Sequence, residues 1–307
     1  MRENIWTGAV DIGGTKIQIG LVDRAGRILQ EKTFQTNAGR QSPQKAMENI
    51  DRTLRKQCAA IGVDYKALQG IGVSCAGPVD AQKGIVENPY TLPGWEGFPL
   101  VEDLSARSGL PVRLENDANG ALLGEILQRG LWDQKVLMVT FGTGIGVAFW
   151  NGRAVYRSGR FHPEMGHIIV ASGGDACYCG HRGCFESRCS GQALNRRAAQ
   201  TGYTDFDALY AAAVADGPAA QLLEEICRDI QNGIWSLSVI FKPQYIVLGG
   251  GFTKRYFQML RDATLRDSAG KGDFLEEFSV LPALENRNSA LVGAVMLFKE
   301  ENQDEEV

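Results

Sequence analysis

The sequence predicts an α/β protein whose two similar halves face each other across a cleft. Its 307 residues are enough for two domains of ordinary size. A strand, a turn containing glycine and threonine, and a second strand occur near the start of the chain and again from about residue 136. Short apolar strands and amphipathic helical segments follow both copies, which is typical of α/β units.

The first half opens with a predicted β-hairpin. Residues 9–21 alternate apolar with polar or small side chains around the glycine-rich turn Asp11–Lys16. A helix is predicted from its N-cap Ser42 to Gly62, because apolar side chains recur every three or four residues between them. Two short buried strands and another helix are expected next: residues 71–74, residues 112–114, and a helix beginning near Ala121.

The second half repeats the opening pattern. Residues 136–140 and 146–150 are predicted strands, joined by the turn Phe141–Gly144. The later elements are predicted as helices at residues 191–200 and 219–240, a strand at 245–248 and a last helix at 290–299. The acidic residues 300–307 are expected to fray.

Charge and hydropathy exclude several classes of partner. The sequence has 32 Lys and Arg against 36 Asp and Glu, a net charge of -4, and no basic tract, so nucleic acid is not an expected partner. The longest apolar stretch, residues 136–150, contains three glycines and falls short of the roughly 20 residues that span a bilayer. The first residues lack the apolar core of a signal peptide. We therefore expect a cytoplasmic protein that contacts no membrane.

The two glycine-rich turns are candidate phosphate sites. Asp11–Thr15 and Gly142–Gly144 each combine unobstructed backbone amides with a threonine hydroxyl, and such amides bind phosphate oxygens. Two turns, one in each half, can hold one polyphosphate from both sides. The alternative is a pair of tight hairpin turns without a ligand. Asp11 favours a functional role for the first turn, because a carboxylate among phosphate-binding amides is explained by a divalent cation between them.

A polar segment, Glu115–Asn119, follows the strand at residues 112–114. Strand ends are where α/β proteins place reactive side chains. A carboxylate there can accept a proton from an attacking hydroxyl, and the neighbouring amide can bind another hydroxyl. The alternative is that Asp117 or Asn119 is a helix N-cap, which the spacing alone favours.

Three cysteines, Cys177, Cys179 and Cys184, fall within eight residues. Thiolates are good zinc ligands, and a closed tetrahedral zinc site needs four ligands. All the histidines of the chain lie close by in sequence: His162, His167 and His181. We expect a structural zinc site, for which both His167 and His181 remain candidates as the fourth ligand.

Two glutamates flank this cluster. Glu164 precedes it and Glu186 follows it, so a metal would hold both on a rigid loop. Paired carboxylates accept hydrogen bonds from adjacent hydroxyls, as a polyhydroxylated ligand requires. The alternative is that both are surface charges. Farther along the chain, Gly249–Gly251 would let a flat ring approach the backbone, or simply end a strand.

Taken together, these motifs resemble the ROK family (repressor, open reading frame, kinase) of bacterial sugar kinases and sugar-responsive regulators. The resemblance covers nearly the whole chain, and the cysteine block followed by Glu186 is its most specific part. It implies two actin-like (ribonuclease H-like) α/β domains around a cleft. The N-terminal domain is expected to comprise residues 1–118 plus 290–307, and the C-terminal domain, with its zinc loop, residues 119–289.

The resemblance also implies roles for individual residues. Asp117 would be the general base. The sugar would be bound by Asn116, Glu164, His167 and Glu186, and Zn²⁺ by His167, Cys177, Cys179 and Cys184. Mg-ATP would be bound by Asp11, Gly13, Gly14, Thr15, Lys16, Gly142, Thr143, Gly144, Gly249, Gly250 and Gly251, of which the last three would lie by the adenosine.

The implied activity is ATP-dependent phosphorylation of a hexose or N-acetylhexosamine at its 6-hydroxyl, by a homodimer or larger homo-oligomer. One alternative is a sugar-responsive regulator of the same family, but such relatives carry a DNA-binding helix-turn-helix before the kinase-like body, whereas here the first phosphate turn begins at Asp11. Another is fructokinase-type rather than glucokinase-type specificity, because Phe161-His162-Pro163 precedes Glu164 as in some fructokinase-like members.

Overall fold

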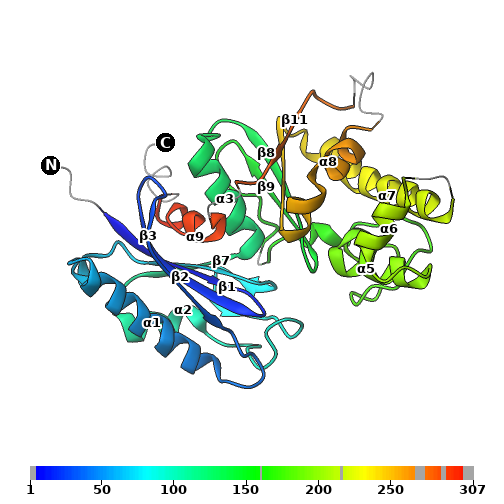
Figure 1. The fold of residues 1–307 in the computed structure, drawn as a ribbon. Helices are drawn as coiled ribbons and strands as arrows, with labels where there is room; N and C mark the ends of the chain where they lie inside the picture. Colours follow the sequence, from blue (N-terminus) through cyan, green and yellow to red (C-terminus); the bar gives the residue numbers. More distant parts are fainter. Residues whose placement is uncertain (1–4, 160, 215–216, 267–273, 285–287, 300–307) are drawn as a thin grey trace. The chain divides into compact units, whose positions relative to one another are not determined.

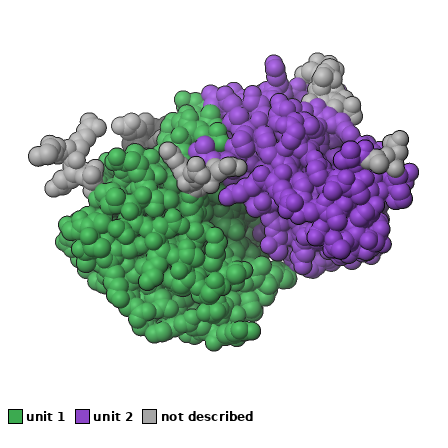
Figure 2. Space-filling model, in the orientation of Figure 1, with its two compact units in different colours: residues 1–133, 150–163, 286–307 green, residues 134–149, 164–285 purple. Residues whose placement is uncertain are grey.

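The computed structural model describes residues 5–159, 161–214, 217–266, 274–284 and 288–299. The chain forms two compact units (Figure 2): unit 1, with residues 1–133, 150–163 and 286–307, and unit 2, with residues 134–149 and 164–285. The predicted domain boundary at residues 118/119 lies inside a helix of unit 1, and the division into domains stays a prediction. The acidic tail expected to fray, residues 300–307, lies outside the described residues.

Unit 1 contains a five-stranded sheet in the order β3-β2-β1-β4-β7. Its strands are β1 (Trp6–Ile12), β2 (Lys16–Asp23), β3 (Ile28–Gln35), β4 (Ile71–Cys75) and β7 (Val112–Asn116). β1, β2 and β3 pair antiparallel, whereas β1, β4 and β7 pair parallel. The hairpin and both short strands are therefore confirmed. Because β1, β4 and β7 are parallel, the segments that follow β4 and β7 leave the sheet at the edge that carries the β1–β2 turn.

Helices cover both faces of this sheet (Figure 1). On one face α1 (Pro43–Ala60) and α2 (Leu100–Ser108) pack over the main apolar core. Ser42 caps α1 as predicted, since its side chain accepts a hydrogen bond from the amide of Lys45. On the other face α3 (Asp117–Arg129) and α9 (Ser289–Gly293) lie against each other. Smaller elements complete the unit: η1 (Tyr65–Ala67), β5 (Val79–Asp80) and β6 (Ile85–Val86).

Two predicted helix boundaries are wrong. The helix expected to begin near Ala121 begins at Asp117, because Asn116 caps it. The last helix, expected over residues 290–299, is the short α9 followed by the 3-10 helix η3 (Met296–Phe298). Gly293, where α9 ends, packs so closely on α3 that a Cβ there would clash with the carbonyl oxygen of Gly120.

Unit 2 contains a four-stranded sheet in the order β11-β10-β8-β9. Its strands are β8 (Lys135–Phe141), β9 (Ile145–Asn151), β10 (Tyr245–Gly249) and β11 (Ser279–Pro282). β10 pairs parallel with both β8 and β11. The three-residue turn Gly142–Gly144 joins β8 to β9. The predicted second hairpin and the strand at 245–248 are thus confirmed.

The helices of unit 2 are α4 (Phe185–Cys189), α5 (Gly191–Gln200), α6 (Phe206–Ala212), α7 (Pro218–Phe241), α8 (Gly251–Leu265) and the 3-10 helix η2 (Met165–His167). α5 and α7 confirm the two predicted helices. α8 is not predicted from the sequence, since the glycines at its start are typical of a loop. No helix in the described part of the chain is both long and apolar enough to cross a membrane.

Candidate active site

The β1–β2 turn in unit 1 is a tight hairpin with exposed residues at its tip. The amide of Gly13 donates to the carbonyl of Lys16 at 2.9 Å, and the Thr36 hydroxyl donates to the carbonyl of Gly13 at 2.6 Å. A Cβ at Gly14 would lie 2.9 Å from the carbonyl oxygen of Thr91, so glycine is required by this close approach. Gly14, Thr15 and Lys16 are exposed and accessible to a ligand.

Asp11 and Asp117 lie at the same edge of the unit 1 sheet. Asp11 is near the end of β1, Asp117 directly follows β7, and β4 lies between the two strands. Burial, followed by the charge of Asp117, raises the pKa of Asp11 to about 7, while Lys16 opposes the shift. Burial raises the pKa of Asp117 to about 6, against the hydrogen bond from the Ala118 amide. Both carboxyls therefore exchange protons close to neutral pH, where a general base is most effective.

Asn116 is the N-cap of α3. Its Oδ1 accepts hydrogen bonds from the amides of Ala118 at 2.9 Å and Asn119 at 3.4 Å. The alternative in which Asp117 or Asn119 caps the helix is therefore wrong. Asp117 occupies the first helical position, where its carboxylate is not needed as the cap. The cap uses only Oδ1 of Asn116, so the Nδ2 group takes no part in it.

A charged pair that the sequence reasoning missed holds the segment before Asp117. Glu115 is buried, and its Oε1 accepts from the Asn116 amide and from Asn119 Nδ2, both at 2.9 Å. Its Oε2 accepts from Arg157 Nε at 3.0 Å and Nη2 at 2.6 Å. Arg157 is 42 positions away in sequence, so no local pattern predicts the pair. The pair fixes the backbone that precedes Asp117.

In unit 2, Glu186 is bound to the turn Gly142–Gly144. Its Oε2 accepts a hydrogen bond from the amide of Ile145 at 2.8 Å. Gly144 packs against the same carboxylate, and a Cβ there would clash with it. The Gly142 carbonyl accepts from the amide of Gly191, at the start of α5, at 2.8 Å. Glu186 is therefore not a free surface charge. A movement of the turn Gly142–Gly144 would also move the carboxylate of Glu186.

The predicted zinc ligands lie together in unit 2. The ligand atoms of His167, Cys177, Cys179 and Cys184 all lie within 4.8 Å of one another. Cys177 Sγ is 3.4 Å from His167 Nδ1, and Cys179 Sγ is 3.5 Å from Cys184 Sγ. Four donors around Zn²⁺, with Zn–S near 2.3 Å and Zn–N near 2.0 Å, are separated by roughly 3.5 to 4 Å. The cluster fits this ion, and His167 rather than His181 completes it.

The buried Arg188 anchors the loop that carries the cysteine cluster to the helices of unit 2. It donates to Asp229 of α7 at 2.8 Å and to Asp175, two residues before Cys177, at 3.1 Å. Glu164, in contrast, is exposed and stands directly before η2, where its carbonyl accepts from the His167 amide at 3.0 Å. Glu164 and His167 are therefore linked through the backbone.

The run Gly249–Gly251 ends β10 and begins α8. Gly250 has a positive φ of 90°, and a Cβ there would clash with the backbone of Phe141. Gly251 has no atom within 4 Å of a Cβ position. The glycines thus end the strand, as one of the two predicted alternatives has it, and they also leave open backbone at Gly251.

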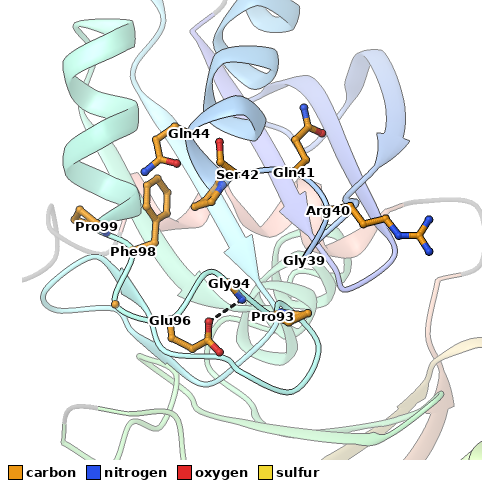
Figure 3. Close-up of a pocket in the computed structure, with 12 residues that line it drawn as sticks. Gly39, Arg40, Gln41, Ser42, Gln44, Pro93, Gly94, Glu96, Phe98 and Pro99 are labelled. Atoms are coloured by element: carbon orange, nitrogen blue, oxygen red, sulfur yellow. Dashed lines mark hydrogen bonds between the residues drawn. The ribbon is translucent and has the colours of Figure 1, made fainter.

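A surface hollow of about 650 Å³ in unit 1 contains none of the predicted site residues (Figure 3). It lies between the segment that leads into α1 and the segment that leads into α2, and its lining includes Arg40, Gln44, Glu96 and Phe98. Only the last of these is apolar, and the hollow is widely open. A smaller cavity in unit 1 is lined by Glu115, Asn116 and Arg157 among others, next to Asp117.

Comparison with known proteins identifies the family. Residues 7–301 match the model of the ROK family. The chain belongs to this family. A glucokinase of Streptomyces coelicolor is 32% identical to this ROK protein over 322 residues, which cover 96% of the chain and 98% of the relative.

Two solved structures resemble this ROK protein closely. The ROK hexokinase of Thermus thermophilus has a TM-score of 0.83 at 30% identity, covering 98% of this chain and 100% of that one. The ROK family glucokinase of Streptomyces griseus, solved with glucose and AMPPNP, has a TM-score of 0.72 at 31% identity, covering 95% and 98%. The predicted family and the predicted α/β fold with two actin-like domains are therefore confirmed.

Proposed function

We propose that this ROK protein transfers the γ-phosphoryl group of Mg-ATP to the 6-hydroxyl of a hexose or N-acetylhexosamine. The chain is an ATP-dependent sugar kinase, like its glucokinase and hexokinase relatives. The observation that carries the finer proposal is the carboxyl of Asp117, which follows β7, is not needed as a helix cap, and has a pKa of about 6.

Asp117 acts as the general base. As the sugar oxygen bonds to the γ-phosphorus and the bond to the ADP oxygen breaks in line, the carboxylate of Asp117 takes the proton of the attacking hydroxyl. Phosphoryl transfer depends mainly on positioning and on neutralisation of charge. The pair of Glu115 and Arg157 contributes to positioning, because Glu115 accepts the amide hydrogen of Asn116 and so holds the segment before Asp117.

The nucleotide is bound by backbone amides and one carboxylate. The amides of Gly14, Thr15, Thr143 and Gly144 and the two threonine hydroxyls donate to phosphate oxygens. The amides of Gly13 and Gly142 instead donate to carbonyls of their own turns and keep the turns tight. Asp11 would hold the Mg²⁺ of Mg-ATP, since carboxylate oxygens are ligands that Mg²⁺ prefers. The cation neutralises phosphate charge when bound. The exposed Lys16 adds a positive charge near the same phosphates, and the open backbone at Gly251 supports an adenosine site at Gly249–Gly251.

The sugar is bound by Asn116, Glu164, His167 and Glu186. Carboxylates accept from sugar hydroxyls, and the Nδ2 group of Asn116, which the helix cap does not use, donates to one. His167, Cys177, Cys179 and Cys184 would hold a structural Zn²⁺, a role that their donor set and spacing support. The bound ion would fix the ring of His167 and the loop before Glu186.

Two further points stay predictions. A cytoplasmic location is supported by the use of ATP and by a thiol cluster that binds metal only when reduced. A homodimer or larger homo-oligomer is expected from the family resemblance alone.

The proposed function is tested by measuring ADP release with Mg-ATP. The panel contains glucose, fructose, mannose, allose, N-acetylmannosamine and N-acetylglucosamine. We expect turnover of at least one sugar, with the product phosphorylated at the 6-position by NMR. Preference for fructose would support the fructokinase-type alternative. Absence of turnover with every sugar, together with specific binding to an operator DNA, would instead support a regulator.

A further inference from the structure

Tyr178 lies between two of the zinc ligands and faces a third. It follows Cys177 and precedes Cys179, and its ring meets the ring of His167 edge to face, with centroids 5.1 Å apart and an interplanar angle of 87°. The Tyr178 hydroxyl is 3.1 Å from His167 Nε2. Although the hydroxyl has this partner, 61% of the residue's surface is exposed. The side chain thus reaches into the site from the solvent side.

The same hydroxyl also interacts with the two glutamates. It forms a side-chain hydrogen bond with Glu186, and Glu164 lies close enough for its charge to act on the hydroxyl. A carboxylate oxygen only accepts a hydrogen bond, so the hydroxyl donates to Glu186. Two residues proposed to bind the sugar, His167 and Glu186, therefore form hydrogen bonds with the hydroxyl of Tyr178, and a third, Glu164, lies near it.

The hydrogen-bonding pattern is the one that a sugar hydroxyl would have. Nδ1 of His167 faces Cys177, so when Nδ1 is a metal ligand the proton is on Nε2, which donates to the Tyr178 oxygen. The Tyr178 hydroxyl in turn donates to Glu186. A sugar hydroxyl bound at this site would likewise accept a hydrogen bond from the imidazole and donate one to the carboxylate.

We propose that, in the sugar-free protein, the Tyr178 hydroxyl occupies the position that one sugar hydroxyl takes on binding, so that Tyr178 competes with the sugar. The inference rests on the proposed sugar-binding role of Glu164, His167 and Glu186. Sugar binding then exchanges one set of hydrogen bonds for an equivalent set and gains little from them. Because the ring is largely exposed, the side chain has room to rotate into the solvent when a sugar enters.

The proposed competition predicts how the affinity for sugar changes when the Tyr178 hydroxyl is removed. It acts only on the sugar-free state, so removing the hydroxyl should strengthen the binding of every accepted sugar by the same factor. A tyrosine that contacts the bound sugar would behave differently, since its removal would weaken binding, and by a factor that depends on the sugar.

The test compares Tyr178→Phe with the wild type by calorimetric titration with each sugar that the panel identifies as a substrate, without ATP. We expect Kd to fall about two- to tenfold, the effect of one hydrogen bond, by a common factor for all sugars. KM should fall in parallel, without a matching change in kcat. Tyr245→Phe, at the beginning of β10, is the matched control and should leave Kd unaltered. Zinc content is measured for both variants.

A second measurement does not depend on the variant's affinity. The protein is labelled with 3-fluorotyrosine, and the ¹⁹F resonance that is missing from the spectrum of Tyr178→Phe is assigned to Tyr178. In the protein with Tyr178 present, adding sugar should shift this resonance towards the chemical shift of a solvated tyrosine. An unmoved resonance overturns the inference, as does equal, weaker or sugar-dependent binding by the variant. If the wild type phosphorylates a sugar but neither the stronger binding by Tyr178→Phe nor the ¹⁹F shift is observed, only the proposed competition is wrong. If it phosphorylates none, the proposed function fails and the inference fails with it.

Discussion

The carboxyl of Asp11 has its pKa raised partly by the charge of Asp117, across one intervening strand of the same sheet. The two residues have separate proposed roles, one towards Mg²⁺ and one towards the attacking hydroxyl. Their repulsion is relieved when a cation binds Asp11 or when Asp117 takes a proton. Both events belong to the proposed reaction, so the site without ligands is poised for them.

The first prediction concerns Asp117 as the base. Asp117→Asn should preserve the shape of the site but lower kcat on the order of 10²-fold or more, because an amide cannot take the proton. The Kd for sugar, measured by calorimetry, should change much less. Asp103→Asn, at a partly buried site on α2 where Asp103 pairs with Arg107, is the control and should keep wild-type turnover. A kcat near the wild-type value for Asp117→Asn would remove the catalytic assignment.

The second prediction concerns the pH dependence of activity. The base must be ionised, and the pKa of Asp117 is about 6 in the free protein. Asp11, with a pKa of about 7, must also be ionised to hold Mg²⁺, so kcat/KM should rise with pH between about 5 and 8 as both carboxyls lose their protons. Initial rates in constant-ionic-strength buffers from pH 5 to 8 would measure this. A profile that is flat down to pH 5 contradicts the prediction.

The third prediction concerns stability. The folded-state pKa of Asp11, about 7, exceeds its ordinary value of 3.8, so the folded protein binds this proton more tightly than the unfolded chain does. The contribution to stability is complete below about pH 4 and is lost as pH rises towards 7. Asp11→Asn avoids this loss, so its Tm relative to the wild type should be higher at pH 8 than at pH 5. Scanning calorimetry at both pH values measures this difference in Tm. A relative Tm of Asp11→Asn that is lower at pH 8 than at pH 5 would refute the raised pKa of Asp11.

The fourth prediction concerns the metal. The purified protein should contain about one zinc per chain, as a closed four-ligand site requires. Cys184→Ser should lose zinc and bind sugar more weakly, because His167 and the loop before Glu186 are no longer fixed. Cys58→Ser, in the apolar core of unit 1, is the control for loss of a buried thiol and should retain the metal. Full activity in a zinc-free preparation would exclude the proposed role.

The fifth prediction concerns the pair of Arg157 and Glu115. Arg157→Met leaves the buried carboxylate of Glu115 without its charged partner and should lower the free energy of unfolding by about 1.5 to 3 kcal/mol. Adding Glu115→Gln removes the charge while keeping an acceptor for the Asn116 amide, so the double variant should recover much of the stability. Urea unfolding of Arg157→Met, of Glu115→Gln alone and of the double variant measures the coupling. Additive losses would mean that the two residues act independently.

Features encoded within a few neighbouring residues could be predicted from the sequence. The cysteine cluster is an example, because three cysteines fall within eight residues and the structure brings them together with His167. Both hairpins and the long helix α7 follow from alternation, apolar spacing and glycine turns. These patterns are local, so the sequence predicts these elements without knowledge of the tertiary structure.

Features that depend on distant residues could not be predicted. The pair of Glu115 and Arg157 joins segments 42 positions apart. The cap of α3 is Asn116 rather than Asp117 or Asn119, and all three of these polar residues suit that position in sequence. The helix α8 begins at Gly251, where glycine ordinarily disfavours helix and the close packing of Gly250 on Phe141 decides the backbone.

The arrangement of unit 1 has a consequence for biosynthesis. Its sheet is complete once β7 has been made, but the face formed by Ala9 and Val22 is covered by Leu291 and Val295, which come from the far end of the chain. While the ribosome synthesises unit 2, that apolar face has Leu127 of α3 against it but lacks Leu291 and Val295. A nascent chain of this protein should therefore bind a holdase chaperone until α9 emerges, and unit 2 can complete its fold first.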